Sequence, residues 1–424
     1  MNKKLPLISL FIMSIISIFY WTLKPKELYE AKWNAPDNTL AITIDGEIST
    51  TFPTKKNYTT DITCTSGTGN IEWNGTKWIL TTSGITKGST KCNVIFKLQT
   101  FGETILANNE VKTPITTPGA AVSTADEALL ASAEDDYGTS YYFRGAVTNN
   151  YVEFANKCWR IVRVGGDGSV KLILHNDNTA GVASPCDAAN NSARAAFAHY
   201  DGTTYSSAFN TNYNDNVYVG FMYGTAGASD YASTHANTNK STILTNLETW
   251  YTNNLVAYES KLADTIWCND KSTINGGLGY GTNATDYGAY NRIKSTKQPT
   301  LKCPNDKNGG KLSKFTVDDT TNGNGNLTYK IGLLTADELA YAGYAGGTRN
   351  TTTYLQENAS YDKWWSLSPN SFSDSKAYVF SVYSVGVGGI RADAVIGVRP
   401  SISLVPSTSI SGGSGTSEDP YVVN

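Results

Sequence analysis

A β-hairpin is encoded by residues 159–174, which comprise WRIVRV (159–164), GGDG (165–168) and VKLIL (170–174). Two runs rich in β-branched and aliphatic residues flank a glycine-rich tetrapeptide, the pattern of antiparallel strands joined by a tight turn. A calcium loop would need oxygen ligands at alternate positions after Asp167, and the sequence does not supply them. The stretch therefore predicts sheet structure in the larger part of the chain.

Outward from this hairpin, strands and helices are predicted to share one domain over residues 123–406. Apolar residues follow a three-four spacing from Ser241 to Leu262, which predicts an amphipathic helix. The tetrapeptide TADE occurs at 124–127 and again at 335–338, and it is the capping-box pattern that starts a helix. Further strands are expected at 377–382, 385–389 and 395–404. We therefore expect an α+β domain.

The segment 176–240 is polar and rich in Gly, Asn, Ser and Tyr. It is too long for a loop without a function in a compact domain, so we expect it either to carry additional structural elements or to be functional.

Residues 38–112 are predicted to form a separate, small all-β domain. Alternating strands are expected there, with a hairpin at Asn74-Gly75, and two tryptophans, Trp73 and Trp78, lie between cysteine-bearing strands. This pattern predicts an immunoglobulin-like sandwich with a disulfide across its core. A Pro/Thr/Gly-rich linker is expected at 113–122, and a polar C-terminal tail at 407–424.

The N-terminal segment 1–26 is predicted to be an export signal that stays in place as a membrane anchor. Two lysines precede 19 uncharged residues from Leu5 to Leu23, about the length that spans a bilayer. The alternative is a cleaved signal peptide and a secreted protein. In both cases a short stalk at 27–37 and everything after it are expected to be extracellular.

The six cysteines agree with an oxidising compartment. They fall as sequential pairs without a C-x-x-C, and no histidine lies at metal-ligand spacing from any of them. Three disulfides in sequence order are our prediction, although six cysteines allow many pairings. The expected pairs are Cys64 with Cys92, Cys158 with Cys186, and Cys268 with Cys303.

Composition excludes two classes of protein. A net charge of −3 over 424 residues shows no basic excess, so we expect no nucleic-acid partner. Charged residues make up 17% and hydrophobic ones 40%, which excludes disorder driven by charge excess.

Several motifs of the larger domain resemble those of a known family. The motifs are WRIV from Trp159, a helix with Trp250, WWSLSP ending at Pro369, and GVRPSISL containing Arg399 and Pro400. In this order they are similar to a domain of unknown function that is common in secreted Gram-positive proteins. The resemblance implies a C-type-lectin-like fold, shared with the formylglycine-generating enzymes and with phage receptor-binding variable proteins.

The resemblance also implies roles and limits for particular residues. Structural roles are implied for Trp159, Trp365, Pro369, Arg399 and Pro400. Leu367 stands where the family often has Arg, so no role of that Arg carries over. Since Cys268 and Cys303 are expected to pair with each other, the copper site of the formylglycine-generating enzymes does not carry over either.

Catalytic residues are not assigned from the sequence. The only imidazoles are His175, His199 and His235, and there is no G-x-S-x-G nucleophile elbow beside them. Adjacent acids at 134–136 and 318–319 fit solvated loops better than the separated carboxylates of a glycosidase. We expect no metal and no cofactor.

Aromatic residues in the polar loops are the predicted ligand-binding groups. Sugar rings stack on Trp and Tyr through their apolar C–H faces, and protein interfaces favour the same residues. The candidates are Tyr213, Tyr218, Tyr223, Tyr361 and Trp364. The sequence therefore predicts an anchored, adhesin-like surface protein whose partner is a glycan or a surface protein. An extracellular enzyme acting on a cell-wall or host polymer, and a non-binding structural surface protein, are the alternatives.

Overall fold

The structure is a computed structural model that describes residues 39–122, 124, 127–348, 352–360, 363–383 and 386–423. The chain divides into two compact units, 1–97 and 98–424, called here the smaller and the larger unit. Within the described ranges, no helix has both the length and the apolar character needed to cross a membrane. The expected anchor at 1–26 and stalk at 27–37 lie outside the described residues.

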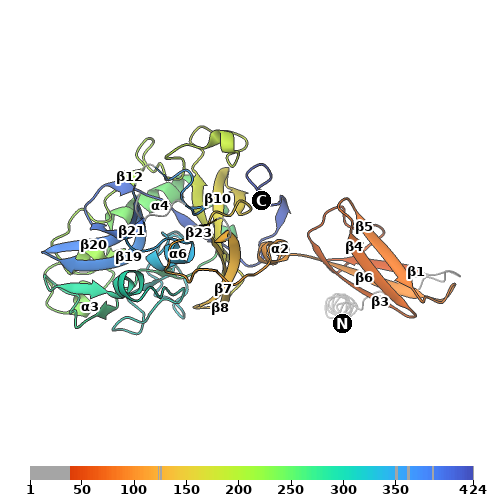
Figure 1. The fold of residues 1–424 in the computed structure, drawn as a ribbon, viewed down its shortest axis with the longest axis horizontal. Coiled ribbons are helices and arrows are strands. Elements are labelled where there is room, and N and C mark those ends of the chain that lie inside the picture. Colours follow the sequence, from red (N-terminus) through yellow and green to blue (C-terminus); the bar gives the residue numbers. More distant parts are fainter. Residues whose placement is uncertain are drawn as a thin grey trace, which may run out of the picture. The chain divides into compact units, whose positions relative to one another are not determined.

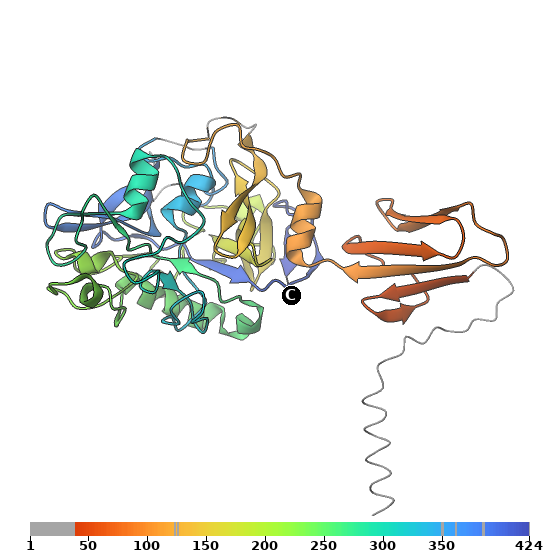
Figure 2. The ribbon, with the colours of Figure 1, turned by 90° about the horizontal axis from the view of Figure 1, so that it is seen from below.

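The smaller unit consists of a four-stranded sheet and a two-stranded hairpin (Figure 2). The sheet has the order β2-β1-β6-β3, with strands β1 (Thr39–Ile44), β2 (Glu47–Ser49), β3 (Tyr58–Cys64) and β6 (Lys91–Leu98). The hairpin pairs β4 (Thr68–Trp73) with β5 (Trp78–Ser83). Ile71 and Trp78 of the hairpin pack against Ile42, Val94 and Phe96 of the sheet, so the two layers bury one small core.

The disulfide of the smaller unit lies within one sheet, not between two. Cys64 ends β3 and Cys92 lies in β6, and these strands are neighbours in the four-stranded sheet. The expected immunoglobulin-like disulfide across the core is therefore wrong. The core is closed instead by aromatic packing, with the Trp78 and Phe96 rings 5.3 Å apart.

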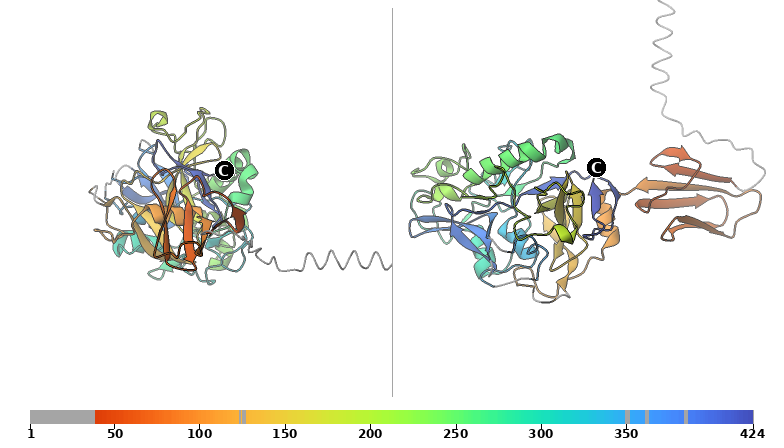
Figure 3. Two further views of the ribbon diagram at one scale, coloured as in Figure 1. Left: turned by 90° about the vertical axis from the view of Figure 1, so that its right-hand side faces the viewer. Right: turned by 90° about the horizontal axis from the view of Figure 1, so that it is seen from above.

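Residues 98–112, expected in the small domain, belong to the larger unit, as do the expected linker and C-terminal tail. Helix α2 (Phe101–Asn108) starts with a capping box at Thr100 and lies beside β25 (Tyr421–Val423) (Figures 2 and 3). The Phe101 and Tyr421 rings are 5.3 Å apart, and Asn108 donates a hydrogen bond to the Tyr421 hydroxyl. The boundary thus falls after Lys97, before the predicted 113–122 linker, and part of the predicted tail at 407–424 forms strands.

One eight-stranded sheet of the larger unit is built around the predicted hairpin. Its main path is β23-β11-β10-β9-β25-β24, with β8 also paired to β10 and β7 to β8. The strands not yet given are β7 (Leu129–Asp135), β8 (Gly138–Arg144), β9 (Tyr151–Phe154), β10 (Lys157–Val164), β11 (Val170–Asn176), β23 (Ser401–Leu404) and β24 (Ile410–Gly412). Every residue of β10 and β11 is buried, including the charged side chains of Arg160, Arg163 and Lys171.

A second sheet of seven strands lies in the same unit (Figure 1). Its path is β12-β22-β19-β17-β16, with β20 on β19 and β21 on β20. The strands are β12 (Ser206–Ser207), β16 (Thr273–Ile274), β17 (Thr285–Tyr287), β19 (Trp364–Ser373), β20 (Lys376–Tyr383), β21 (Gly386–Arg391) and β22 (Ile396–Gly397). Helix α6 (Ala336–Tyr341) contacts both β8 and β19, so it joins the two sheets.

The remaining described elements are two ribbons, three helices and several single turns. Two ribbons pair β13 (Met222–Tyr223) with β14 (Asn239–Lys240) and β15 (Trp267–Cys268) with β18 (Lys314–Phe315). The other α-helices are α3 (Tyr231–Thr234), α4 (Thr242–Asn254) and α5 (Gly288–Tyr290). A π-helical turn covers Asn291–Ser295, and 3-10 turns cover Ala188–Asn190, Asn216–Val219 and Val256–Lys261.

The predicted α+β class is wrong, because the structure is mostly β, with 34% strand and 14% helix. The helix expected from Ser241 to Leu262 begins at its Ser241 cap but ends at Asn254, and a 3-10 turn follows. Of the helix expected after Thr124, residues 125 and 126 lie outside the described residues, and the chain is already in strand β7 at Leu129. Helical spacing and a cap pattern therefore overestimated how much helix the chain forms.

Three disulfides pair the cysteines in sequence order: Cys64–Cys92, Cys158–Cys186 and Cys268–Cys303. No described cysteine is free. These bonds indicate an extracellular or otherwise oxidising environment.

Candidate functional site

The tryptophans of the WWSLSP motif are buried. Trp364 and Trp365 are 1% and 0% exposed in strand β19, and the Trp365 indole donates a hydrogen bond to the Ser207 carbonyl. Trp364 packs under the Arg399 guanidinium, whose carbon lies 5.1 Å from the ring centroid. Trp364 therefore offers no surface on which a ligand could stack. Tyr361 lies outside the described residues.

The three loop tyrosines are half-buried, and two of them touch. Tyr218 and Tyr223 meet edge to face with centroids 5.8 Å apart. The ring of Tyr213 lies 4.4 Å from the Arg391 guanidinium carbon. Its neighbour Asn212 donates a hydrogen bond to the Tyr218 hydroxyl, so the three side chains belong to one surface.

The other motif residues make contacts in the interior of the larger unit. Trp159 is fully buried and donates to the Phe154 carbonyl. Arg399 is also fully buried and donates to the carbonyls of Leu174 and Leu355. Pro369 lies in β19 opposite Val379, and the Pro400 carbonyl accepts from the Leu174 amide. These contacts are structural.

A polar cleft of about 190 Å³ lies where strand β11 ends and the loop to Ala195 begins. The residues that line it are Asn176, Asp177, Asn178, Thr179, Ala180, Val182, Asn190, Ser192, Arg194, Ala195 and His199. The cleft lies inside the segment 176–240, which composition had singled out.

Asparagine side chains build the walls of this cleft. The Asn178 amide donates to the carbonyls of Asn156 and Val182, and the Asn176 amide donates to those of Pro185 and Asn190. Asn178 has a φ of 52°, a left-handed conformation that asparagine tolerates better than most residues. The walls are thus held by hydrogen bonds inside the loop.

Asp177 is the central group of the cleft. One carboxylate oxygen, Oδ1, accepts from the Lys157 amine at 2.8 Å and from the Trp250 indole at 3.0 Å. The other, Oδ2, accepts from the His199 backbone amide at 2.8 Å and lies 3.1 Å from its ring Nδ1. A strand, a helix and a loop therefore converge on one carboxylate.

This environment keeps Asp177 ionised. Burial alone would raise the pKa of the carboxyl, but the His199 hydrogen bonds and the nearby Lys157 charge hold that pKa below its usual range. The carboxylate in turn orients the His199 ring, whose side chain is 18% exposed. Within the part of the chain that the structure describes, His199 Nε2 has no hydrogen-bond partner, so it is available to a ligand.

The cleft also contains polar side chains that are free to bind a ligand. The hydroxyls of Thr179 and Ser192 make no hydrogen bond to any described residue, and both residues are exposed. Tyr205 lies beside the cleft, with the Arg194 guanidinium 5.2 Å from its ring and the His199 ring 5.7 Å away. The cleft thus combines hydrogen-bonding groups with an adjacent aromatic ring.

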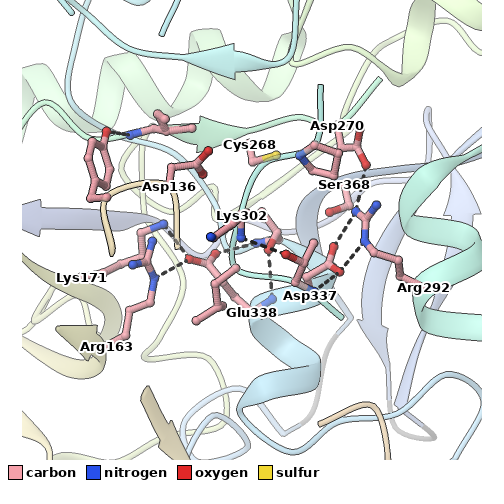
Figure 4. A pocket seen from close by; sticks show the side chains of 16 residues that line it. Asp136, Arg163, Lys171, Cys268, Asp270, Arg292, Lys302, Asp337, Glu338 and Ser368 are labelled. Carbon is pink, nitrogen blue, oxygen red and sulfur yellow. Dashed lines mark hydrogen bonds and ion pairs between the residues drawn. The ribbon is translucent and has the colours of Figure 1, made fainter. Parts of the chain in front are cut away.

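A second cavity, lined by charged side chains, is internally neutralised. Figure 4 shows Arg163 and Lys171 directed at Glu338, and Arg292 directed at Asp337 and Asp270. Arg292 binds Asp337 through two hydrogen bonds of 2.7 and 2.9 Å and lies 2.9 Å from Asp270. Burial would raise the pKa of Glu338, but Lys171 and Arg163 lower it to about 2. Since its charges pair with each other, this cavity fits a structural role.

The two remaining histidines are fully buried. His175 contacts the Asn358 amide, and burial together with the Arg160 charge lowers its pKa well below the ordinary value. His235 bonds the Gly279 carbonyl, and burial is the main cause that lowers its pKa well below the ordinary value. Across the described residues, no group of three or more His, Cys, Asp or Glu side chains could hold a metal ion.

Comparison with family models, with curated proteins and with solved structures found no match to this chain. The resemblance to the C-type-lectin-like family of surface proteins therefore remains a prediction. The sequence did not single out Asp177, because its partners at 157, 199 and 250 come from separate elements. The polar composition of the loop was the one signal that pointed to the cleft.

Proposed function

We propose that the larger unit binds a glycan in the cleft centred on Asp177 and His199. The observation that carries this proposal is the oriented His199 ring beside exposed hydroxyls and an aromatic side chain. A sugar presents hydroxyl groups, which need both donors and acceptors, and an apolar C–H face, which packs on aromatic rings. Ser192, Thr179 and His199 line the cleft and supply the polar groups. The Tyr205 ring, which stacks on Phe197, lies beside His199 and supplies the aromatic surface.

The disulfides support exposure of this cleft to extracellular ligands. Cys158–Cys186 ties strand β10 to the loop that carries the cleft, so the loop is held in place before a ligand binds. Preorganisation of this kind reduces the entropy lost on binding. The motif resemblance to domains of surface proteins agrees with ligand binding, but it assigns no residue of the cleft.

The test is a glycan array that compares the full chain with point variants. Ser192→Ala and Thr179→Ala remove exposed hydroxyls, and His199→Gln removes the imidazole. We expect each variant to weaken binding of the same glycan at least several-fold. Tyr223→Ala, outside the cleft, is the control and should bind as the parent does. Loss of binding in the tyrosine variant alone would place the ligand on the tyrosine surface instead.

A second candidate function is hydrolysis of the bound ligand. It rests on the Asp177–His199 pair, since a carboxylate that orients an imidazole is the arrangement of a general base. Incubation of array-positive glycans with the protein would reveal shortened products if the pair acts on its ligand. Binding without turnover would leave a lectin-like function, and no binding at all would favour a protein partner or a structural role.

A further inference from the structure

Lys271 is a fully buried lysine whose amine faces an amide side chain. Its Nζ donates to the Asn237 Oδ1 at 2.5 Å and to the Met222 carbonyl at 2.9 Å, and it lies 5.1 Å from the Phe315 ring centroid. Lys271 is 0% exposed and Asn237 is 5% exposed. The amine and the amide are therefore held together in a site from which water is excluded.

Lys271 differs from the other buried lysines in lacking a carboxylate partner. Lys157 lies 2.8 Å from Asp177, and Lys171 lies 2.7 Å from Glu338. Among the described residues, no carboxylate oxygen lies within 4.0 Å of the Lys271 amine. A buried ammonium without such a partner is costly, so the neutral amine is favoured.

The protonation state fits a nucleophile. Burial lowers the pKa of Lys271 to about 7, even though the Asp306 charge acts in the opposite direction. A neutral amine is thus well populated at neutral pH, and a desolvated lysine amine is the form that attacks carbonyl carbons.

We propose that Lys271 and Asn237 form an intramolecular isopeptide bond. The lone pair of the neutral Nζ attacks Cγ of Asn237, and a new C–N bond forms there. The Cγ–Nδ2 bond breaks, one Nζ proton moves to Nδ2, and the nitrogen leaves as ammonia. Atoms and electrons balance without an oxidant, a reductant or a co-reactant, and the fixed geometry replaces an external catalyst by proximity.

The bond would close a covalent loop between two segments that are 34 residues apart. Asn237 lies between α3 and β14, and Lys271 follows the Cys268 end of a disulfide. The isopeptide bond would therefore add a second cross-link to this part of the larger unit, one that reducing agents do not break. Cross-links of this kind stabilise mainly by restricting the unfolded chain.

Peptide mapping of the reduced full chain tests the proposal directly. Proteolysis should release one branched species that contains both the Asn237 and the Lys271 peptides, lighter than their sum by one ammonia molecule. Trypsin should also fail to cleave after Lys271, because its amine is acylated. Recovery of both peptides as separate, unmodified species from the parent protein would overturn the proposal.

Matched variants check that these two side chains react. Lys271→Met and Asn237→Ala should each give separate peptides. Asn237→Asp should give a branched species of the same mass as the parent, since it loses water where the parent loses ammonia. A branched species that persists in Lys271→Met would assign the bond to another residue. If a variant fails to fold, the map of the parent protein still decides the question.

Discussion

Lys171 and Glu338 lie 167 residues apart in the sequence, and their Nζ and Oε1 atoms are 2.7 Å apart in the interior of the larger unit. The same carboxylate accepts from Arg163 at 3.3 Å and caps α6 through the Thr335 amide at 3.0 Å. Glu338 thus joins the hairpin β10–β11 to the helix that contacts both sheets. One side chain both starts a helix and fixes its position.

Glu338→Gln should destabilise the larger unit strongly. The substitution keeps the shape of the side chain but removes the charge that neutralises Lys171 and Arg163, and a buried pair broken in this way typically costs about 3–5 kcal/mol. Urea unfolding at pH 7 would measure the change. Because the pKa of Glu338 is lowered to about 2, its stabilisation is present above about pH 4.5 and lost as the pH falls toward 2. Parent and variant should therefore converge in acid.

The control for this prediction is Glu134→Gln. Glu134 is 57% exposed and lies 3.9 Å from the Lys302 amine, so the loss of its charge should change the unfolding free energy by less than about 0.5 kcal/mol. Equal effects of the two substitutions would refute the structural role given to the buried network.

The two TADE tetrapeptides show what local sequence can and cannot predict. At 335–338 the predicted capping box is present in the structure. At 124–127 the Glu127 carboxylate instead accepts from Arg144 at 3.1 Å and from the Thr116 amide, and β7 follows. The same four residues thus have different outcomes, because the Glu338 carboxylate accepts from the amide of its own cap residue Thr335, whereas the Glu127 carboxylate accepts from the Thr116 amide.

The hairpin and the cleft also differ in how far local sequence predicts them. The hairpin at 159–174 could be predicted because its signal is local, a turn between two apolar runs. The cleft could not be located to the residue, because Lys157, Trp250 and His199 converge on Asp177 only in the folded chain. Trp364 is buried, although the sequence predicts it as a ligand-binding residue. The local sequence alone does not distinguish a buried aromatic residue from an exposed one.

Stability should fall as the pH drops below about 6.5 because of the two buried histidines. In the unfolded chain His175 and His235 take up protons near that pH, but in the folded chain burial lowers the pKa of each well below it. The unfolded state therefore binds more protons, and each histidine removes up to about 1.4 kcal/mol per pH unit. Urea unfolding at several pH values from about 7.5 to about 5 would measure this slope, because that range lies on both sides of the histidine pKa in the unfolded chain.

His235→Gln tests the assignment of that slope. The variant has no imidazole to titrate, so its unfolding free energy should depend on pH less steeply than that of the parent. Burial and the nearby Lys307 charge disfavour protonation of His235. An unchanged slope would show that other groups govern the acid sensitivity.

Asp177→Asn should destabilise the chain, and the effect should depend on Lys157. The substitution leaves a buried ammonium without its carboxylate, which typically costs about 3–5 kcal/mol. Adding Lys157→Met removes that ammonium, so the double variant should be more stable than Asp177→Asn alone. Chemical denaturation of the parent, of Asp177→Asn, of Lys157→Met and of the double variant gives the coupling energy between the two residues. If the two substitutions change the free energy of unfolding additively, the ion pair between Lys157 and Asp177 does not stabilise the fold.

The disulfides should be reduced in an order set by their burial. Cys158 and Cys186 are 0% and 1% exposed, while Cys64 is only partly buried at the end of β3. Thiol–disulfide exchange requires a thiolate to reach a sulfur atom, so a mild reductant without denaturant should open Cys64–Cys92 first. Alkylation at increasing times, followed by peptide mass analysis, would record the order. Because Cys158–Cys186 opens only when the larger unit unfolds at least locally, urea should accelerate its reduction far more than that of Cys64–Cys92. Simultaneous reduction of both without urea would show that the core around Cys158 is open to solvent.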